Sequence, residues 1–184
     1  TGDKYIGVCT VMVTMPGLPM FGHGQIEGFT EKYGMEFRRA QWEEREDPAL
    51  VERHRREIFP LVHRREQFAQ TAEFCLYDLG TADGVNEDVY AYSNRAGDAV
   101  SLVVYHNRFA DTSGWLTSSV PAKDKASGNL VTRHISDGLG IRGGPDDYLV
   151  FREHRSGLEY LRPSRQLAEE GFFVSLGAYE CRVY

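Results

Sequence analysis

The sequence predicts a mainly β protein, in which a helix–strand–helix segment precedes an antiparallel β domain. An apolar run over residues 5–15 stops at Pro16-Gly17, as buried helices often do. A second, amphipathic helical pattern follows a long polar stretch. After Ala72 the chain breaks into short runs of Val, Tyr, Phe and Leu between clusters of Gly, Asn, Asp and Ser, which is typical of strands joined by turns. We therefore predict two units, residues 1–71 and residues 72–184.

The first unit begins with a segment that has almost no polar face. Its length favours a buried helix over residues 5–15, and the short apolar run Leu18–Phe21 favours a strand covered on both sides. The polar stretch up to Asp47 is predicted as a long loop. Asp47 is then a suitable N-cap and Pro48 a suitable first residue for a helix over residues 48–69.

Two features of this second helix are predicted from its composition. Pro60 lies inside the helical pattern and should kink or split the helix near Phe59. The Arg- and Glu-rich residues, Glu57 among them, are interpreted as an outer face held by ion pairs between nearby turns, in preference to an anion site.

The second unit contains eight runs that fit strands of an antiparallel sandwich or barrel. The runs are residues 73–79, 87–93, 100–106, 129–134, 148–153, 158–161, 172–176 and 179–184. Residues 164–171 fit one short helix.

The composition of the chain favours some classes of protein and argues against others. A hydrophobic content of 41% suffices for a packed core, and a formal charge of −6 argues against a nucleic-acid partner. Cys9, Cys75 and Cys181 are widely spaced in apolar surroundings, which favours free thiols in a reducing, cytoplasmic compartment over one disulfide with a spare cysteine. No zinc-type spacing is present, and we expect no metal and no cofactor. The longest apolar run is too short to span a bilayer, so we expect no membrane partner.

The segment from Thr14 to Gly28, TMPGLPMFGHGQIEG, carries a family resemblance. It resembles the last strand of the catalytic barrel of the α-amylase family of glycoside hydrolases, where a Pro-Gly-x-Pro-Met segment runs into Gly-Gln-Glu. This chain departs from that pattern. Gly22-His23 stand where the family commonly has tyrosine, Ile26 takes the usual Glu position, and Glu27 comes one residue late.

The resemblance implies an architecture and a role for the whole chain. Residues 1–71 would be the terminal helix–strand–helix of a (β/α)8 barrel, and residues 72–184 the Greek-key sandwich called domain C. The catalytic carboxylates of such an enzyme would lie upstream, so we expect no catalytic residue here. The expected partners are the upstream barrel of the same polypeptide, α-glucan, and a second copy through the exposed apolar N-terminal segment.

Five residues are candidates for sugar contact. His23, Gln25 and Glu27 would lie at the rim of the barrel, where the loops after the strands form the active site. Gln25 and Glu27 would otherwise tie the turn to its neighbours. Trp42 and Trp115 stand in polar surroundings and either stack on sugar rings or pack beneath their loops.

Two other functions remain open. The chain could be a self-contained carbohydrate-binding or interaction module, in which the helical segment simply packs on the sandwich. It could also be an unrelated hydrolase that uses His23 and Glu27.

Overall fold

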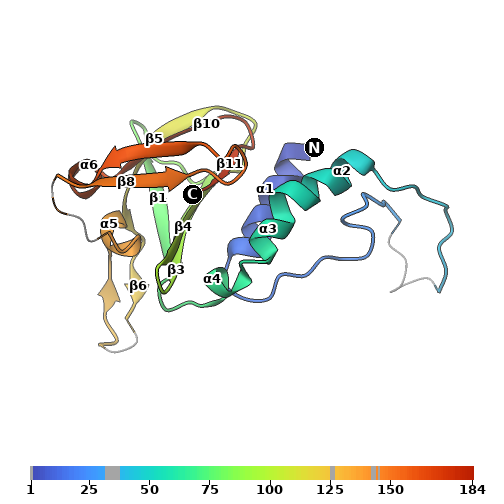
Figure 1. The fold of residues 1–184 in the computed structure, drawn as a ribbon, viewed down its shortest axis with the longest axis horizontal. Helices are drawn as coiled ribbons and strands as arrows, with labels where there is room; N and C mark the ends of the chain where they lie inside the picture. The colour runs from blue at the N-terminus through green and yellow to red at the C-terminus, as the bar shows by residue number, and fades with distance from the viewer. Residues whose placement is uncertain (1, 32–37, 125–126, 142–143, 145) are drawn as a thin grey trace.

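The computed structural model describes residues 2–31, 38–124, 127–141, 144 and 146–184. Helices α1 to α4 gather at one end of the molecule, and the strands lie at the other end together with α5 and α6 (Figure 1). The helices are α1 (Gly2–Thr14), α2 (Pro48–Arg53), the π-helical turn η1 (His54–Ile58), α3 (Phe59–Val62), α4 (Arg65–Ala69), α5 (Ile135–Gly138) and α6 (Ser164–Glu169). Within the described residues, no helix is long and apolar enough to cross a membrane.

The helix predicted over residues 5–15 is confirmed as α1, but the strand predicted over Leu18–Phe21 is wrong. Residues 18–21 have no regular structure, and no described strand lies beside them to supply hydrogen bonds. The side chains of Leu18 and Met20 are 92% and 77% exposed. A strand needs a neighbour to satisfy its backbone, so its apolar composition alone does not form one here.

The second predicted helix is confirmed as the broken series α2, η1, α3 and α4. Asp47 caps it, because its side-chain oxygen accepts hydrogen bonds from the N–H groups of Ala49 (3.0 Å) and Leu50 (3.2 Å). Pro60 has no N–H to donate, and the turn just before it widens into η1, where the Phe59 N–H bonds to the His54 carbonyl. The predicted break near Phe59 is thus confirmed as a π-helical turn.

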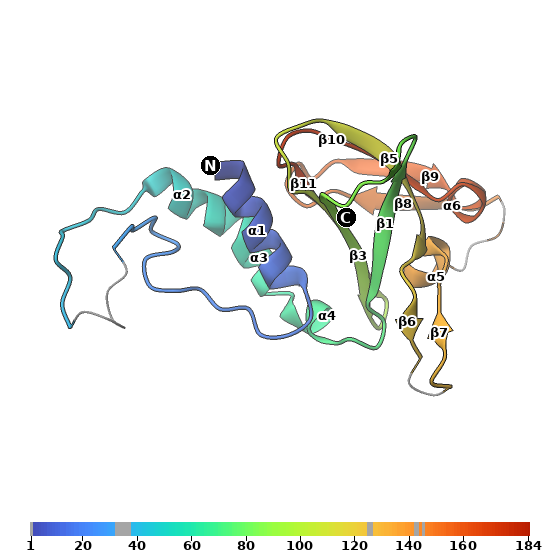
Figure 2. The ribbon, with the colours of Figure 1, turned by 180° about the vertical axis from the view of Figure 1, so that it is seen from behind.

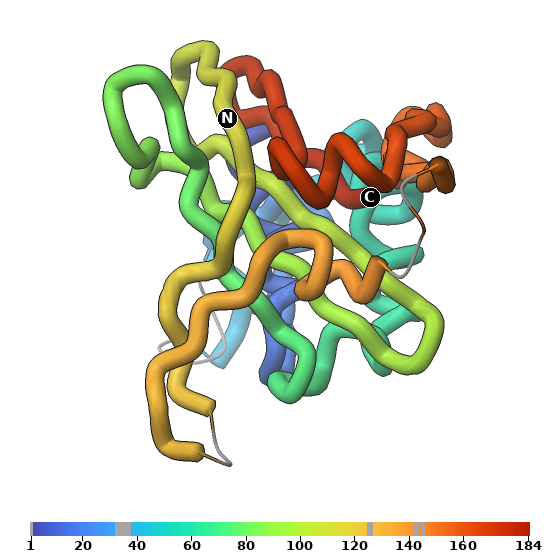
Figure 3. Tube along the Cα trace, turned by 90° about the vertical axis from the view of Figure 1, so that its left-hand side faces the viewer, coloured from blue at the N-terminus to red at the C-terminus, as the bar shows by residue number. Residues whose placement is uncertain are grey.

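All the strand pairs are antiparallel, and most strands join one sheet with the order β10-β5-β1-β3-β4-β11. The strands are β1 (Cys75–Thr81), β2 (Gly84–Val85), β3 (Val89–Ala96), β4 (Ala99–His106), β5 (Thr112–Ser119), β6 (Ala122–Lys123), β7 (Leu130–Val131), β8 (Tyr148–Arg152), β9 (Glu159–Pro163), β10 (Phe172–Leu176) and β11 (Cys181–Val183). β2 pairs with β1, while β6–β7 and β8–β9 form separate two-stranded ribbons. The β6–β7 ribbon projects away from the sheet (Figure 2, Figure 3).

The mainly β, antiparallel class is confirmed, but the described residues form eleven strands in place of the expected eight. They form one seven-stranded sheet and two ribbons, and the Greek-key sandwich stays a prediction. β5 was missed because its sequence, TSGWLTSS, is rich in Ser and Thr with few large apolar residues. It becomes a central strand through its pairing with β1 and β10.

The sheet has an apolar core on each face. On one face the β8–β9 ribbon, α5 and α6 cover a cluster that includes Tyr77, Leu102 and Leu116. On the other face Ile6 and Val13 of α1, with Leu61 of α3, pack against strands β3, β4 and β11. Gly7 lets α1 approach the sheet, because a Cβ there would overlap the ring of Tyr105. The helices therefore rest directly on the β-sheet.

The cysteines are free and buried, which confirms the prediction of free thiols over a disulfide. Cys9 lies on the helical side of the sheet together with Cys181, and Cys75 belongs to the opposite core.

Candidate functional site

The turn that follows α1, residues 22–30, holds three of the predicted sugar-contacting residues. The side chain of Gln25 contacts its own turn and α1. Its oxygen accepts a hydrogen bond from the Gly22 N–H (2.9 Å), and its amide nitrogen lies 3.9 Å from the Cys9 sulfur. The Tyr5 hydroxyl donates to the Gln25 carbonyl (2.8 Å) and so ties the turn to α1. These contacts join Gln25 to the turn and to α1.

His23 and Glu27 lie on the same turn as Gln25 and make other contacts. His23 is exposed, with its ring centroid 6.1 Å from that of Phe29. Glu27 is half-buried, and its carbonyl accepts the N–H of Asp47 at 2.8 Å. This bond joins the turn to the cap of α2.

Trp42 belongs to the same region of the molecule. Glu31 accepts the backbone N–H groups of Gln41 (2.7 Å) and Trp42 (3.2 Å), and Glu44 accepts those of Thr30 (2.7 Å) and Glu31 (2.9 Å). The Trp42 side chain is 61% exposed. Four of the five candidates therefore lie in loops that are hydrogen-bonded to each other, beside the helices.

Trp115 lies elsewhere, on β5 of the main sheet. Its ring meets Phe173 of β10 edge to face, with centroids 5.2 Å apart. The Trp115 ring is half-buried and Phe173 is 48% exposed. This aromatic pair is separate from the turn.

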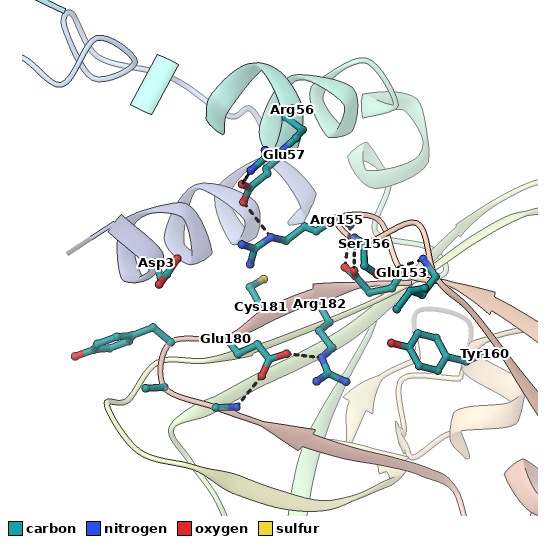
Figure 4. Close-up of a pocket in the computed structure, with 14 residues that line it drawn as sticks. Asp3, Arg56, Glu57, Glu153, Arg155, Ser156, Tyr160, Glu180, Cys181 and Arg182 are labelled. Carbon is teal, nitrogen blue, oxygen red and sulfur yellow. Dashed lines mark hydrogen bonds and ion pairs between the residues drawn. The ribbon is translucent and has the colours of Figure 1, made fainter. Parts of the chain in front are cut away.

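A second candidate site is a 680 Å³ cavity where the helices meet the β-sheet (Figure 4). One of the residues that line it is Glu57 of η1, whose side chain is only 2% exposed. Glu57 pairs with Arg53 (3.2 Å), Arg56 (2.8 Å) and Arg155 (3.0 Å). Arg155 comes from the loop between β8 and β9, so these pairs join η1 to that loop. We name the set of four residues, Glu57 with Arg53, Arg56 and Arg155, the Glu57 joint.

Two contacts of His154, the residue before Arg155, strengthen the Glu57 joint. The His154 ring nitrogen Nε2 lies 3.0 Å from the Glu57 carbonyl, and the His154 N–H donates to the carbonyl of Val183 in β11 (2.8 Å). η1, the β8–β9 loop and the main sheet are therefore locked together at one point.

The prediction that Glu57 lies on the solvent-facing side of its helix is wrong. Of the pairs expected on that side, Arg55 with Glu52 is indeed exposed at 3.1 Å. Glu57 turns inward instead, as does His54, which is fully buried. The sequence signal for this was the apolar spacing itself, since Glu57 precedes the buried Ile58 and is three residues after His54.

The carboxylates of the cavity are engaged as hydrogen-bond acceptors. Burial raises the pKa of Glu57, but hydrogen bonds from Arg53 and Arg56 and the charge of Arg155 outweigh it, so the pKa lies below its ordinary value. Burial likewise raises the pKa of Glu153, and hydrogen bonds from Arg155 and Ser156 bring it below the ordinary value. Both groups are therefore ionised at neutral pH.

This arrangement does not suit a general acid, which needs a raised pKa to hold its proton at neutral pH. Glu180 is also occupied, because it accepts the Gly177 N–H (2.8 Å) and pairs with Arg182 (2.6 Å). Cys181 also lines the cavity, and burial raises the pKa of its thiol to about 12, which makes it a poor nucleophile. The charged side chains of this cavity are thus paired with one another or with backbone N–H groups.

The described residues contain no group of three or more His, Cys, Asp or Glu side chains that could hold a metal ion.

Comparison with known proteins shows a similarity in structure and no match in sequence. No protein-family model matches the sequence, and no curated protein matches it. The structure is similar to that of an alpha-amylase from Geobacillus thermoleovorans solved in complex with acarbose, with a TM-score of 0.62 and 14% sequence identity. The match covers 100% of this chain and 33% of the amylase chain, so this chain spans about a third of that enzyme's length. At this identity the likeness shows an amylase-like fold alone.

Proposed function

We propose that this chain is the C-terminal, non-catalytic part of an α-amylase-family glycoside hydrolase or transglycosidase that acts on α-glucans. In this proposal residues 1–71 complete the catalytic barrel and residues 72–184 brace it. The observation that carries the proposal is the amylase-like fold over the full chain, together with an apolar segment that lacks its neighbours.

That apolar segment starts on the outer side of α1 and continues after it. Val8 is 50% exposed, and Leu18 and Met20 are more exposed than Val8. Covering a large aliphatic side chain contributes about 1.5–3 kcal/mol, so these three residues together favour a partner by several kcal/mol. A neighbouring barrel strand would both cover them and give residues 18–21 the hydrogen bonds that a strand requires.

The Glu57 joint fits a bracing role. It fixes η1 to the loop between β8 and β9 through the ion pairs of a buried carboxylate. A bracing domain must transmit rigidity in this way, whereas a flexibly tethered binding module has no need of a buried ionic lock.

The first test is the reading frame upstream of Thr1. We expect it to encode barrel strands with the three acidic motifs of the family, and the purified chain by itself to show no activity on starch. An upstream frame without those motifs contradicts the proposal.

The second test concerns the apolar segment in the purified chain. We expect concentration-dependent self-association in light scattering, reduced by the double substitution Leu18→Asp and Met20→Asp. Leu130→Asp is the matched control, because Leu130 is also well exposed (72%) but lies on the β6–β7 ribbon. A monomer with or without the substitutions argues against an unsatisfied surface at this segment.

The alternative function, a carbohydrate-binding module, is favoured by one observation, the pair of the half-buried Trp115 and the exposed Phe173 on the sheet. Titration of maltooligosaccharides separates the two functions. Saturable binding that is lost in Trp115→Ala and retained in Trp42→Ala supports the module, and the absence of binding supports the bracing role.

A further inference from the structure

A cavity of 490 Å³ lies between the start of β1 and the β6–β7 ribbon, and we name it the ribbon cavity. One wall is the segment that leads from α4 into β1, and the other is the base of the ribbon. The apolar residues that line it include Phe74, Cys75, Leu76, Val120, Ala122 and Val131. This size and this lining suit a small molecule, since sites for small molecules are mostly apolar and occupy about 300–1,000 Å³.

Backbone hydrogen bonds hold the two walls of the ribbon cavity together. The Val120 N–H donates to the Leu76 carbonyl (2.8 Å), so the chain enters the ribbon beside β1. The Ser119 N–H donates to the Arg133 carbonyl (2.8 Å), and the Arg133 N–H donates to the Ser119 hydroxyl oxygen (3.0 Å). The fold therefore forms the cavity by itself, and a ligand does not have to order its walls.

Arg133 brings a positive charge with free hydrogen-bond donors to the cavity. Its Nη1 lies 4.0 Å from the sulfur of Cys75 and 3.7 Å from the carboxylate of Glu73, which also pairs with Arg95. No group in the described part of the chain accepts from Nε or Nη2 of Arg133. A guanidinium whose Nε–H and Nη2–H are free can hold a carboxylate through two parallel hydrogen bonds.

The other charges at the cavity favour a ligand with a single negative charge. Lys123 also lines the cavity, and it forms no ion pair with any residue that the structure describes. Asp124 of the lining is engaged, because its carboxylate accepts the N–H and the hydroxyl of Ser127 (2.8 and 2.6 Å). Two cations and one carboxylate leave the lining with one net positive charge. A dianion would in addition be repelled by Glu73, which lies beside Arg133.

We propose that the ribbon cavity binds a small carboxylate with an apolar body, such as an aliphatic or aryl-substituted alkanoate. The carboxylate binds Nε and Nη2 of Arg133, with the charge of Lys123 nearby. The apolar body occupies the space between Phe74, Leu76 and Val131. This inference is independent of the proposed glycosidase role, because it uses only the cavity and the side chains that line it.

The test uses the complete chain and two probes of the same shape, phenylacetate and its neutral amide, phenylacetamide. Binding is followed by backbone amide shifts in NMR titrations at neutral pH. We expect phenylacetate to bind saturably with a dissociation constant of about 1 mM and with shifts centred on Leu76, Val131 and Arg133. We expect phenylacetamide to bind at least about tenfold more weakly, because it loses the charge-assisted hydrogen bonds to Arg133.

Two protein variants address the two parts of the ligand. Arg133→Gln removes the guanidinium, so we expect about a tenfold loss of affinity for phenylacetate and no change for phenylacetamide. Arg108→Gln is the matched control and should bind both probes like the wild type, because Arg108 is likewise held by one carboxylate, Asp88 (2.8 Å), but lines a different cavity. Ala122→Trp, at an exposed position of the ribbon, fills the cavity and should abolish binding of both probes.

The comparison of the two probes and the Ala122→Trp variant decide the matter if Arg133→Gln does not fold. The proposal is overturned by equal affinities of the two probes, by shifts located elsewhere, or by unchanged phenylacetate binding in folded Arg133→Gln. It is also overturned if phenylacetate does not saturate the protein at about 10 mM.

Discussion

Replacing Glu57 by Gln tests whether the Glu57 joint holds the helices to the β-sheet. The substitution keeps the size of the side chain and removes its charge, which leaves three arginines around a neutral amide. Removal of one partner from a buried ion pair costs about 3–5 kcal/mol. Arg53 and Arg155 are 24% and 34% exposed and regain some water, so we expect a loss of about 2 kcal/mol in the free energy of unfolding.

Urea unfolding at neutral pH, followed by circular dichroism, measures this loss. With a denaturant slope of about 2 kcal/mol per molar, the midpoint should fall by about 1 M. Glu52→Gln is the matched control, because Glu52 lies on the same helical segment and pairs with Arg55 at the exposed surface. We expect that control to unfold like the wild type, since exposed pairs contribute little.

The pH dependence of the same measurement gives an independent check. Folding lowers the pKa of Glu57, so the folded protein binds that proton less readily than the unfolded chain. The stabilisation is complete above the ordinary carboxyl pKa of about 4.3 and is lost as the pH falls through the lower folded value. The difference between wild type and Glu57→Gln should therefore close in acid.

The reasoning is refuted if Glu57→Gln and Glu52→Gln have the same midpoint at neutral pH, or if the difference between Glu57→Gln and wild type persists unchanged in acid. Either result would mean that the arginines are satisfied without the Glu57 charge.

Three further predictions concern individual contacts. Asp47→Ala should cost about 1 kcal/mol of stability in urea unfolding through loss of the helix cap, whereas Glu46→Ala, next to it but outside the cap, should change nothing; equal effects would refute the cap. Gly138→Ala should destabilise by about 1–3 kcal/mol in thermal unfolding, because a Cβ there overlaps the Tyr77 hydroxyl that bonds to Ser93. Gly80→Ala, whose Cβ would meet only the Trp115 carbonyl at 3.6 Å, is its control and should be tolerated. The three thiols should react with iodoacetamide at about pH 8 only after unfolding, since all three are buried, and rapid labelling of the folded protein would contradict this.

The candidate site was predictable only where it depended on neighbours in sequence. The loop residues His23, Gln25 and Glu27 share one turn as expected, because they lie within five residues of each other. Trp115 was grouped with them by residue type, yet β5 places it on the main sheet. The Glu57 joint was missed, since its partner Arg155 belongs to a loop far along the chain.

The sequence by itself determined the features that arise from local forces. Apolar composition and Pro16 set α1 and its end, Asp47 and Pro60 set the start and the break of the second helical segment, and turn residues separated most strands. Only the tertiary structure decided that residues 18–21 are not a strand, that the Ser- and Thr-rich β5 is one, and that Glu57 is buried. The physical reason is that strand pairing and charge burial are satisfied by groups distant in sequence, so no local pattern of residues records them.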